Sequence, residues 1–182
     1  MTAAQADLAR AHREFSELPE GLTLDTPGVE DGAAIWRIAR DSGALDLNSS
    51  YSYLLWCRDF AATSAVARRP DGEPAGFITG YVRPERPGTL VIWQVAVDHA
   101  WRGRGLAAAL LDGLVARTAR ELGVQGIETT VTPDNTASNR LFASFAERHA
   151  APVERRVLFD GGLFPDGGHE PEVLHRIGPL PL

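Results

Sequence analysis

The stretch from Val91 to Gly123 constrains the fold more than any other part of the sequence. It opens with the apolar, largely β-branched run VIWQVAV, which is typical of a buried strand. A short loop rich in arginine and glycine follows. Apolar residues then recur about every 3.6 positions, which predicts an amphipathic helix from Leu106 to Leu122 that ends at Gly123. The stretch therefore predicts a strand–loop–helix unit.

The loop Arg102-Gly103-Arg104-Gly105 lies where this helix begins. The first backbone N–H groups of a helix have no partner within it, and the helix dipole is positive at that end. Glycine lets a ligand approach the backbone closely, and arginine adds fixed positive charge. The loop favours an anion site, most simply one for a pyrophosphate. The alternative is a tight turn with two solvated arginines.

Three phosphate-binding motifs compete for this loop. A P-loop is excluded because Gly-Lys-Ser/Thr is absent. The dinucleotide pattern G-x-G-x-x-A is met from Gly103 onward, with Glu128 at a suitable distance, but five residues separate the strand from that first glycine. The third pattern, R/Q-x-x-G-x-G/A, is met by Arg102, Gly105 and Ala107.

Length and composition set wider limits. A chain of 182 residues is long enough for one domain with a substantial core. The net charge of −6 argues against a nucleic-acid-binding protein, which is normally basic. The single cysteine, Cys57, excludes an internal disulfide, and its apolar surroundings predict a buried, inert thiol in a reducing compartment. We find no signal-peptide or membrane-spanning run and expect a cytoplasmic protein without a membrane partner.

Turn residues and hydrophobic periodicity predict the remaining elements. The resulting order is β-α-α-β-β-β-α-β-α-β-β, and the three strands before the Arg/Gly loop form an antiparallel meander. This order predicts an α/β (α+β) domain with one mixed sheet, spanning 20–182 after a flexible lead-in at 1–19. We expect strands at 22–24, 64–67, 75–82, 91–97, 126–131, 153–159 and 172–177, and helices at 30–42, 51–61, 106–122 and 135–150.

This element order and the third motif together resemble the GNAT superfamily of N-acetyltransferases, in which R/Q-x-x-G-x-G/A holds the pyrophosphate of acyl-CoA. The segment from Asn135 to Phe142 resembles the family's N-x-x-A-x-x-L-Y pattern, with Ser138 in place of the usual Ala. Phe142 stands where a Tyr often reprotonates the CoA thiolate, so the resemblance does not identify the acid. The resemblance implies that acetyl-CoA is bound by Gln94, Val95, Ala96, Val97, Arg102, Gly103, Arg104, Gly105, Leu106, Ala107, Asn135, Ser138, Asn139 and Phe142.

Four longer segments resemble one branch of this superfamily, the L-2,4-diaminobutyrate acetyltransferases of ectoine biosynthesis. They are residues 41–60, 93–98, 131–146 and 163–174, and the resemblance extends over about 22–177. It implies direct transfer of an acetyl group to the 4-amino group of L-2,4-diaminobutyrate, without an acyl-enzyme, by a homodimer. The sequence offers no nucleophile–base pair that would argue otherwise.

The substrate site is expected to contain carboxylates, because its amine must be held and then lose a proton. We assign Asp46 and Tyr51 to substrate positioning and catalysis. Glu170 is the first choice for the base or an ammonium anchor, and Glu172 the second. Trp93 is expected to form a wall of the site, and Asn48, Glu128 and His169 are further substrate-binding candidates.

Each of these candidates has a plainer interpretation. Asn48 and the following serines suit a helix N-cap, and Glu128 suits a solvent-facing strand position. Glu170 and Glu172 suit a solvated turn. We expect no metal site, because His169 and His175 are six residues apart and Pro171 between them opposes a helix.

Two other functions remain open at this stage. One is a GNAT enzyme for a different amine, such as a protein N-terminus, an aminoglycoside or another diamino acid. The other is a non-catalytic acyl-CoA-binding regulatory module, with which Phe142 is consistent. A nicotinamide-dependent oxidoreductase is a more distant possibility.

Overall fold

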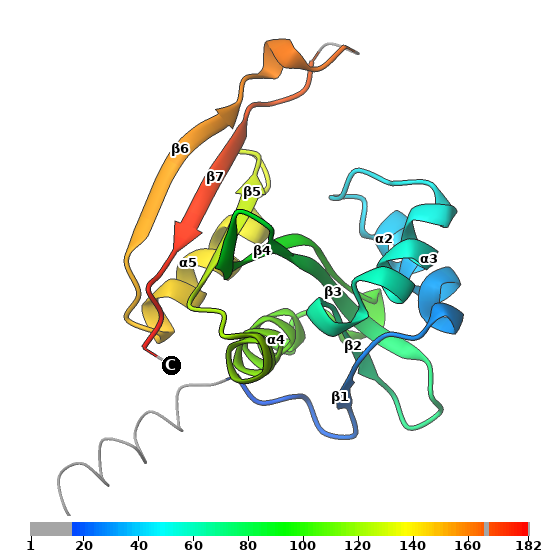
Figure 1. The fold of residues 1–182 in the computed structure, drawn as a ribbon. Helices are drawn as coiled ribbons and strands as arrows, with labels where there is room; N and C mark the ends of the chain where they lie inside the picture. The colour runs from blue at the N-terminus through cyan, green and yellow to red at the C-terminus, as the bar shows by residue number, and fades with distance from the viewer. Residues whose placement is uncertain (1–15, 166–167, 182) are drawn as a thin grey trace, which may run out of the picture.

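The computed structural model describes residues 16–165 and 168–181 and holds one seven-stranded mixed sheet. Figure 1 shows helices on both faces of this sheet and a long β6–β7 hairpin at one end of it. The strands are β1 (Thr23–Asp25), β2 (Ala65–Arg68), β3 (Pro74–Arg83), β4 (Arg86–Val97), β5 (Gly126–Val131), β6 (Val153–Phe159) and β7 (Glu172–Ile177). The helices are α2 (Gly32–Ser42), α3 (Ser50–Asp59), α4 (Leu106–Leu122) and α5 (Thr136–Arg148).

The predicted element order is confirmed throughout the described residues. The strand order is β1-β2-β3-β4-β5-β7-β6, and β2, β3 and β4 form the expected antiparallel meander. The largest difference is in β4, which begins at Arg86, so that part of the predicted turn belongs to the strand. Residues 1–15 of the predicted lead-in lie outside the described residues. The described remainder is attached to the domain, because the backbone N–H of Ser16 donates to Asp112.

Neighbouring residues of β3 show how the sheet divides the core. Ile78 packs with α4 and α5 on one face, and Phe77 packs with α2 and α3 on the other, as the two-residue period of a strand requires. Cys57 belongs to the second cluster and is buried. Burial raises the pKa of this thiol to about 11, which fits the predicted inert cysteine.

Strand β4 carries two irregularities that shape the middle of the sheet. Against β3, Gln94 pairs with Thr79 and Ile92 with Gly80, so Trp93 is the extra residue of a bulge. A Cβ at Gly80 would lie 2.6 Å from the Val91 carbonyl oxygen, and glycine is therefore needed opposite this bulge.

The second irregularity is the short pairing between β4 and β5. These parallel strands pair from Thr89 to Val91 of β4 and then separate. The rest of β4, from Ile92 to Val97, thus has a free edge on the β5 side. The two strands splay apart beyond Val91, and the bulge at Trp93 lies where the splay begins.

Candidate functional site

A pocket of about 540 Å³ opens beside the splay between β4 and β5. β4 contributes Trp93 and Gln94, and β5 contributes Thr130 and Val131. The loop before α3, the loop before α5 and the segment before β7 complete it. Its other lining residues are Ala44, Leu45, Asp46, Asn48, Thr132, Asp134, Asn135, Gly168, His169, Glu170 and Glu172.

The charges of this pocket are almost all negative. Asp46, Asp134, Glu170 and Glu172 line it, and the lining contains neither lysine nor arginine among the described residues. Cations are therefore favoured over anions in this pocket. We call it the acidic pocket.

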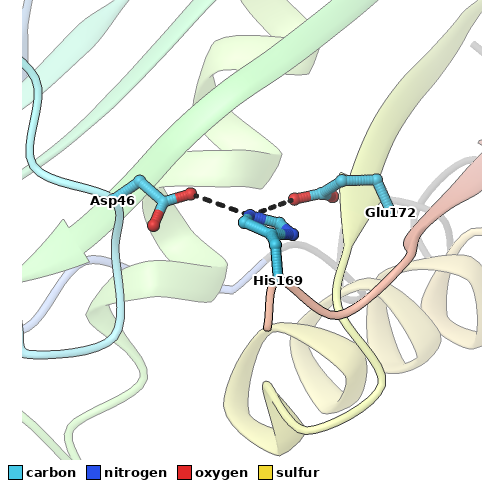
Figure 2. A group of neighbouring side chains, drawn as sticks. All are labelled: Asp46, His169 and Glu172. Carbon is cyan, nitrogen blue, oxygen red and sulfur yellow. Dashed lines mark ion pairs between the residues drawn. The ribbon is translucent and has the colours of Figure 1, made fainter. Parts of the chain in front are cut away.

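Asp46, from the loop before α3, converges with His169 and Glu172, which lie three residues apart where the chain enters β7 (Figure 2). His169 Nε2 lies 3.5 Å from Asp46 Oδ2 and 4.0 Å from Glu172 Oε1. The Asp46 side chain is 89% exposed, whereas those of His169 and Glu172 are 20% and 18% exposed. The Asp46 carboxylate is thus reachable from solvent, and Glu172 lies deeper.

His169 is held in place by its own segment. Its ring stacks on Phe164 with centroids 3.7 Å apart, and its Nδ1–H donates to the Glu170 carbonyl oxygen at 2.5 Å. This hydrogen bond, with the charges of Asp46 and Glu172, raises the pKa of His169 above its ordinary value, although partial desolvation opposes the shift. Nε2 is the nitrogen that faces the carboxylates.

The same three residues meet a geometric condition for a metal ion, because one ligand atom from each lies within 4.8 Å of the others. Two carboxylates and an imidazole suit a divalent cation, but they suit an alkylammonium group equally well. The expectation that the protein needs no metal stays a prediction.

A second cavity of about 510 Å³ lies at the N-terminus of α4 and against α5. Val97, Arg102, Gly103, Gly105, Leu106 and Ala107 line it, as the sequence predicted for a pyrophosphate loop. We call it the loop groove. Gly103 and Gly105 have φ of +74° and +76°, values that glycine adopts readily. The groove offers free N–H groups of a helix N-terminus beside an arginine.

The two arginines of the loop differ in their surroundings. Arg102 donates to the carbonyl oxygens of Val97 and Asp41, which keeps its side chain beside the groove. The guanidinium carbon of Arg104 lies 5.0 Å from the centroid of the Trp101 ring, and Arg104 is not among the groove's lining residues. Arg102 is therefore the better placed of the two.

The backbone of β4 connects the loop groove to the acidic pocket. Val97 lines the groove, and Trp93 and Gln94 line the pocket. Four strand residues span about 13 Å. Val95 and Ala96 lie between these ends. The free edge of β4 between the two sites is therefore formed by residues that the family resemblance assigned to acetyl-CoA.

The first turn of α5 uses its polar side chains within the protein. Asn135 is the N-cap and accepts from the Ser138 N–H, and Asn139 Nδ2 donates to the carbonyl oxygens of Thr132 and Asn135. Asn135 also lines the acidic pocket. These contacts give Asn135, Ser138 and Asn139 a structural role at the pocket's edge.

The structure corrects the assignment of Glu128 to the substrate site. Glu128 is 2% exposed, and its carboxylate accepts from Arg176 at 2.8 Å and from Arg83 at 2.9 Å, with Arg86 at 3.6 Å. Burial acts to raise its pKa, but the hydrogen bond from Arg176 and the charges of the three arginines lower it. Glu128 lines a separate cavity and is neither solvent-facing nor placed to act as a base in the acidic pocket.

The structure places two aromatic candidates outside the acidic pocket. Tyr51 is 65% exposed and does not line the pocket, so its role in substrate positioning stays a prediction. Tyr53 is buried instead, because two residues of a helix lie about 200° apart. Phe142 is buried in the core with Phe145 and lines neither the groove nor the pocket.

Sequence reasoning missed several residues of the acidic pocket. Thr130, Thr132, Asp134 and Gly168 line it but carry no motif of their own. Only their position at the splayed end of β5, or beside His169, could have indicated them. The side chain of Gln94 is also engaged in the pocket, since its Nε2 donates to the backbone carbonyl oxygen of Asp46.

Comparison with known proteins identifies the family that this chain resembles. Residues 33–146 match the sequence model of the Acetyltransferase (GNAT) family. A protein of Streptomyces avermitilis named L-2,4-diaminobutyric acid acetyltransferase is 69% identical over 99% of both chains. A protein of the same name from Nocardia farcinica is 52% identical over 86% of this chain and 80% of its own.

A solved structure is similar as well. It is the diaminobutyrate acetyltransferase EctA from Paenibacillus lautus, in complex with L-2,4-diaminobutyric acid and coenzyme A. Its TM-score is 0.81 at 43% identity, over 87% of this chain and 95% of the other. Ard1 from Thermoplasma volcanium shares the fold, with a TM-score of 0.68 at 20% identity over 86% and 97% of the two chains.

Proposed function

The chain belongs to the GNAT family of acetyltransferases, in its L-2,4-diaminobutyrate acetyltransferase branch, and we propose that the acidic pocket is where it acetylates the 4-amino group of that substrate. The observation that carries the proposal is the position of this pocket. The acidic pocket meets the free edge of β4 at the end away from the loop groove. A thioester delivered along β4 reaches the pocket at Trp93.

Acetyl-CoA is the co-substrate, and the loop groove fits its charged end. The α4 N-terminus and Arg102 face the pyrophosphate, and the glycines leave room for it. The N–H and carbonyl groups on the unpaired edge from Trp93 to Ala96 are available to the amide groups of pantetheine. On this proposal the acetyl group lies beside Trp93, which lines the acidic pocket.

The acidic pocket suits a substrate that carries two ammonium groups and one carboxylate. We assign Asp46 and Glu172 to binding an ammonium group, because both already face a nitrogen, His169 Nε2, in the structure. Glu170 and Asn48 add further polar groups at the pocket wall. The substrate's net positive charge is complemented by the negative lining.

We assign the general base to Glu172 in preference to Glu170. Glu172 is only 18% exposed and lies within the converging group, whereas Glu170 is exposed. The ammonium loses a proton to the carboxylate, directly or through water. The free amine attacks the thioester carbon, the C–S bond breaks and the CoA thiolate leaves. The amide nitrogen then loses its second proton, and because the phenyl ring of Phe142 has no acidic proton and lies in the core, we assign water to carry that proton to the thiolate.

The 4-amino group is the one we expect to react. It ends a two-carbon arm and can reach the splay, whereas the 2-amino group is held beside the carboxylate. Enzyme, acetyl-CoA and L-2,4-diaminobutyrate should release free thiol, and NMR should show acetylation at N4. L-Ornithine and L-lysine, which are longer, should be much poorer substrates. Thiol release that none of the three amines elicits would overturn the substrate assignment.

We further propose a cytoplasmic homodimer that acts in ectoine biosynthesis. Strand β6 lies at the edge of the sheet and exposes Val157 and Phe159 by 54% and 46%, which offers an apolar surface to a second copy. The buried, unpaired Cys57 suits a reducing compartment. No helix among the described residues could span a membrane.

Light scattering tests the proposed dimer. The parent protein should give twice the chain mass, and the double variant Val157→Lys, Phe159→Asp should give one chain mass. A monomeric parent protein would contradict the proposed dimer.

A further inference from the structure

Two buried polar side chains lie beneath the loop that carries Asp46. Tyr53 of α3 is 1% exposed and Gln94 of β4 is 7% exposed. The Tyr53 hydroxyl donates to Gln94 Oε1 at 3.0 Å, and Gln94 Nε2 donates to the backbone carbonyl oxygen of Asp46 at 2.9 Å. Buried polar groups are costly unless they are paired, and these two are paired with each other and with this loop.

The Tyr53 hydroxyl has a second neighbour in the same loop. Burial raises the pKa of Tyr53, while its hydrogen bonds with Asn48 and with Gln94 act in the opposite direction. The geometry fixes the loop at Asp46: Tyr53 of α3 holds the Gln94 side chain of β4, and Gln94 holds the Asp46 carbonyl oxygen.

The loop itself provides little to hold its shape. Among the described residues, no backbone-to-backbone hydrogen bond involves the segment from Leu45 to Asn48. The Asp46 side chain is 89% exposed, and its ion pair among the described residues is with His169 Nε2, at 3.5 Å. The position of the Asp46 carboxylate therefore depends on the contacts made from beneath the loop.

We propose that Tyr53 and Gln94 are positioning residues that set the affinity for the diamine by fixing the backbone at Asp46. The inference rests on the proposed function, since it takes Asp46 to bind a substrate ammonium group. Gln94 also belongs to the strand whose free edge receives the pantetheine arm. One side chain thus ties the substrate loop to the strand that delivers the acetyl group.

Tyr53→Phe is the most direct test, because it removes one hydroxyl and keeps the ring packed against Phe77. A lost hydrogen bond of ordinary strength corresponds to roughly a five- to tenfold change. We expect the KM for L-2,4-diaminobutyrate to rise by about that factor, with the KM for acetyl-CoA within about twofold. Gln94→Met should do the same, because it leaves the Asp46 carbonyl oxygen without its donor.

Thr118→Val is a matched control. Thr118 is fully buried on α4, and its hydroxyl donates to Leu114 within the helix. This variant also loses one buried hydroxyl, but it lies away from the acidic pocket. It should lower the melting temperature and leave both KM values unchanged. If Tyr53→Phe behaves in the same way, Tyr53 serves stability alone and the inference is overturned.

A double-mutant cycle separates this inference from the proposed function. Asp46→Asn alone tests whether Asp46 binds the diamine. If it raises the KM and Tyr53→Phe adds little in the Asp46→Asn background, Tyr53 acts through Asp46 as proposed. If the two increases multiply in full, Tyr53 acts elsewhere and the positioning role is wrong, although Asp46 keeps its own. If Asp46→Asn leaves the KM unchanged, the assignment of Asp46 fails, and the positioning role fails with it.

Discussion

Two sets of carboxylates lie near the middle of the sheet, and they differ in what balances their charge. Glu128 is enclosed by Arg83, Arg86 and Arg176, whose charges are permanent. Within the part of the chain that the structure describes, the ion pairs of Asp46 and Glu172 are with His169, whose charge depends on pH. A carboxylate that is already paired with arginines stabilises the fold, and one that lacks a permanent partner can accept an incoming ammonium group.

The largest expected effect comes from removing charge in the acidic pocket. Asp46→Asn and Glu172→Gln keep the shape of each side chain and remove the carboxylate that binds the amine or takes its proton. For Glu172→Gln we expect kcat/KM for L-2,4-diaminobutyrate to fall by about 10²–10⁴-fold, the range typical of a general acid or base, and for Asp46→Asn we expect the fall to come from a higher KM. Steady-state kinetics with saturating acetyl-CoA measures this fall.

Glu170→Gln is the matched comparison within the same pocket. Glu170 is exposed and lies outside the converging group. We expect it to lose less activity than Glu172→Gln. If Glu170→Gln has the larger effect on kcat, the base assignment must return to Glu170, the first choice from the sequence.

The contrast between these carboxylates could not be derived from the sequence alone. Glu128 is separated along the chain by 45 residues from Arg83 and by 48 from Arg176. Only the pairing of β5 with β7 brings Arg176 opposite Glu128. The local sequence pattern predicts the strand but not the arginine partners of Glu128. The sequence alone therefore suggests a substrate-site role for a carboxylate that is paired within the fold.

Local signals were sufficient where the structure itself is local. The helix from Leu106 to Leu122 and the strands 153–159 and 172–177 have the predicted bounds. Their hydrophobic period and end residues determine them. The glycine loop before α4 is also local, since its geometry depends on Gly103 and Gly105.

The acidic pocket was located by resemblance to a family and not by pattern. Asp46 and His169 are far apart in sequence and meet only in the fold. Within that segment the sequence does not show which tyrosine is buried, because helix phase decides which one faces inward and α3 has apolar residues on more than one side.

Loss of the paired carboxylate of Glu128 should affect the stability of the fold and not substrate binding. Glu128→Gln leaves three arginines around a neutral amide, but these arginines are partly exposed and can regain water. We therefore expect a loss of about 2 kcal/mol, below the usual range for breaking a fully buried pair, or roughly 4–8 °C in melting temperature. Calorimetry measures this loss. The KM for L-2,4-diaminobutyrate should stay within about twofold, and a large rise in KM with unchanged stability would reverse the comparison.

The smallest expected effect is in the pH dependence of stability, and it tests the same contrast without a substrate. The pKa of Glu128 is lowered in the folded protein. Its contribution is therefore fully present above the ordinary glutamate pKa of about 4.3 and is lost as the pH falls through the folded value. Melting temperatures of the parent protein and of Glu128→Gln should differ at pH 7 and converge below about pH 4. Asp112, whose pKa is also lowered, is present in both proteins and cancels from the difference. Above the pH range in which His169 is protonated, Asp46→Asn should follow the parent protein, because the Asp46 carboxylate is exposed and its ion pair among the described residues is with His169, which is then uncharged. The melting temperatures of Asp46→Asn and of the parent protein could instead differ at pH 7 and converge below about pH 4, as expected of Glu128→Gln. In that case both carboxylates stabilise the fold and the contrast between them is wrong.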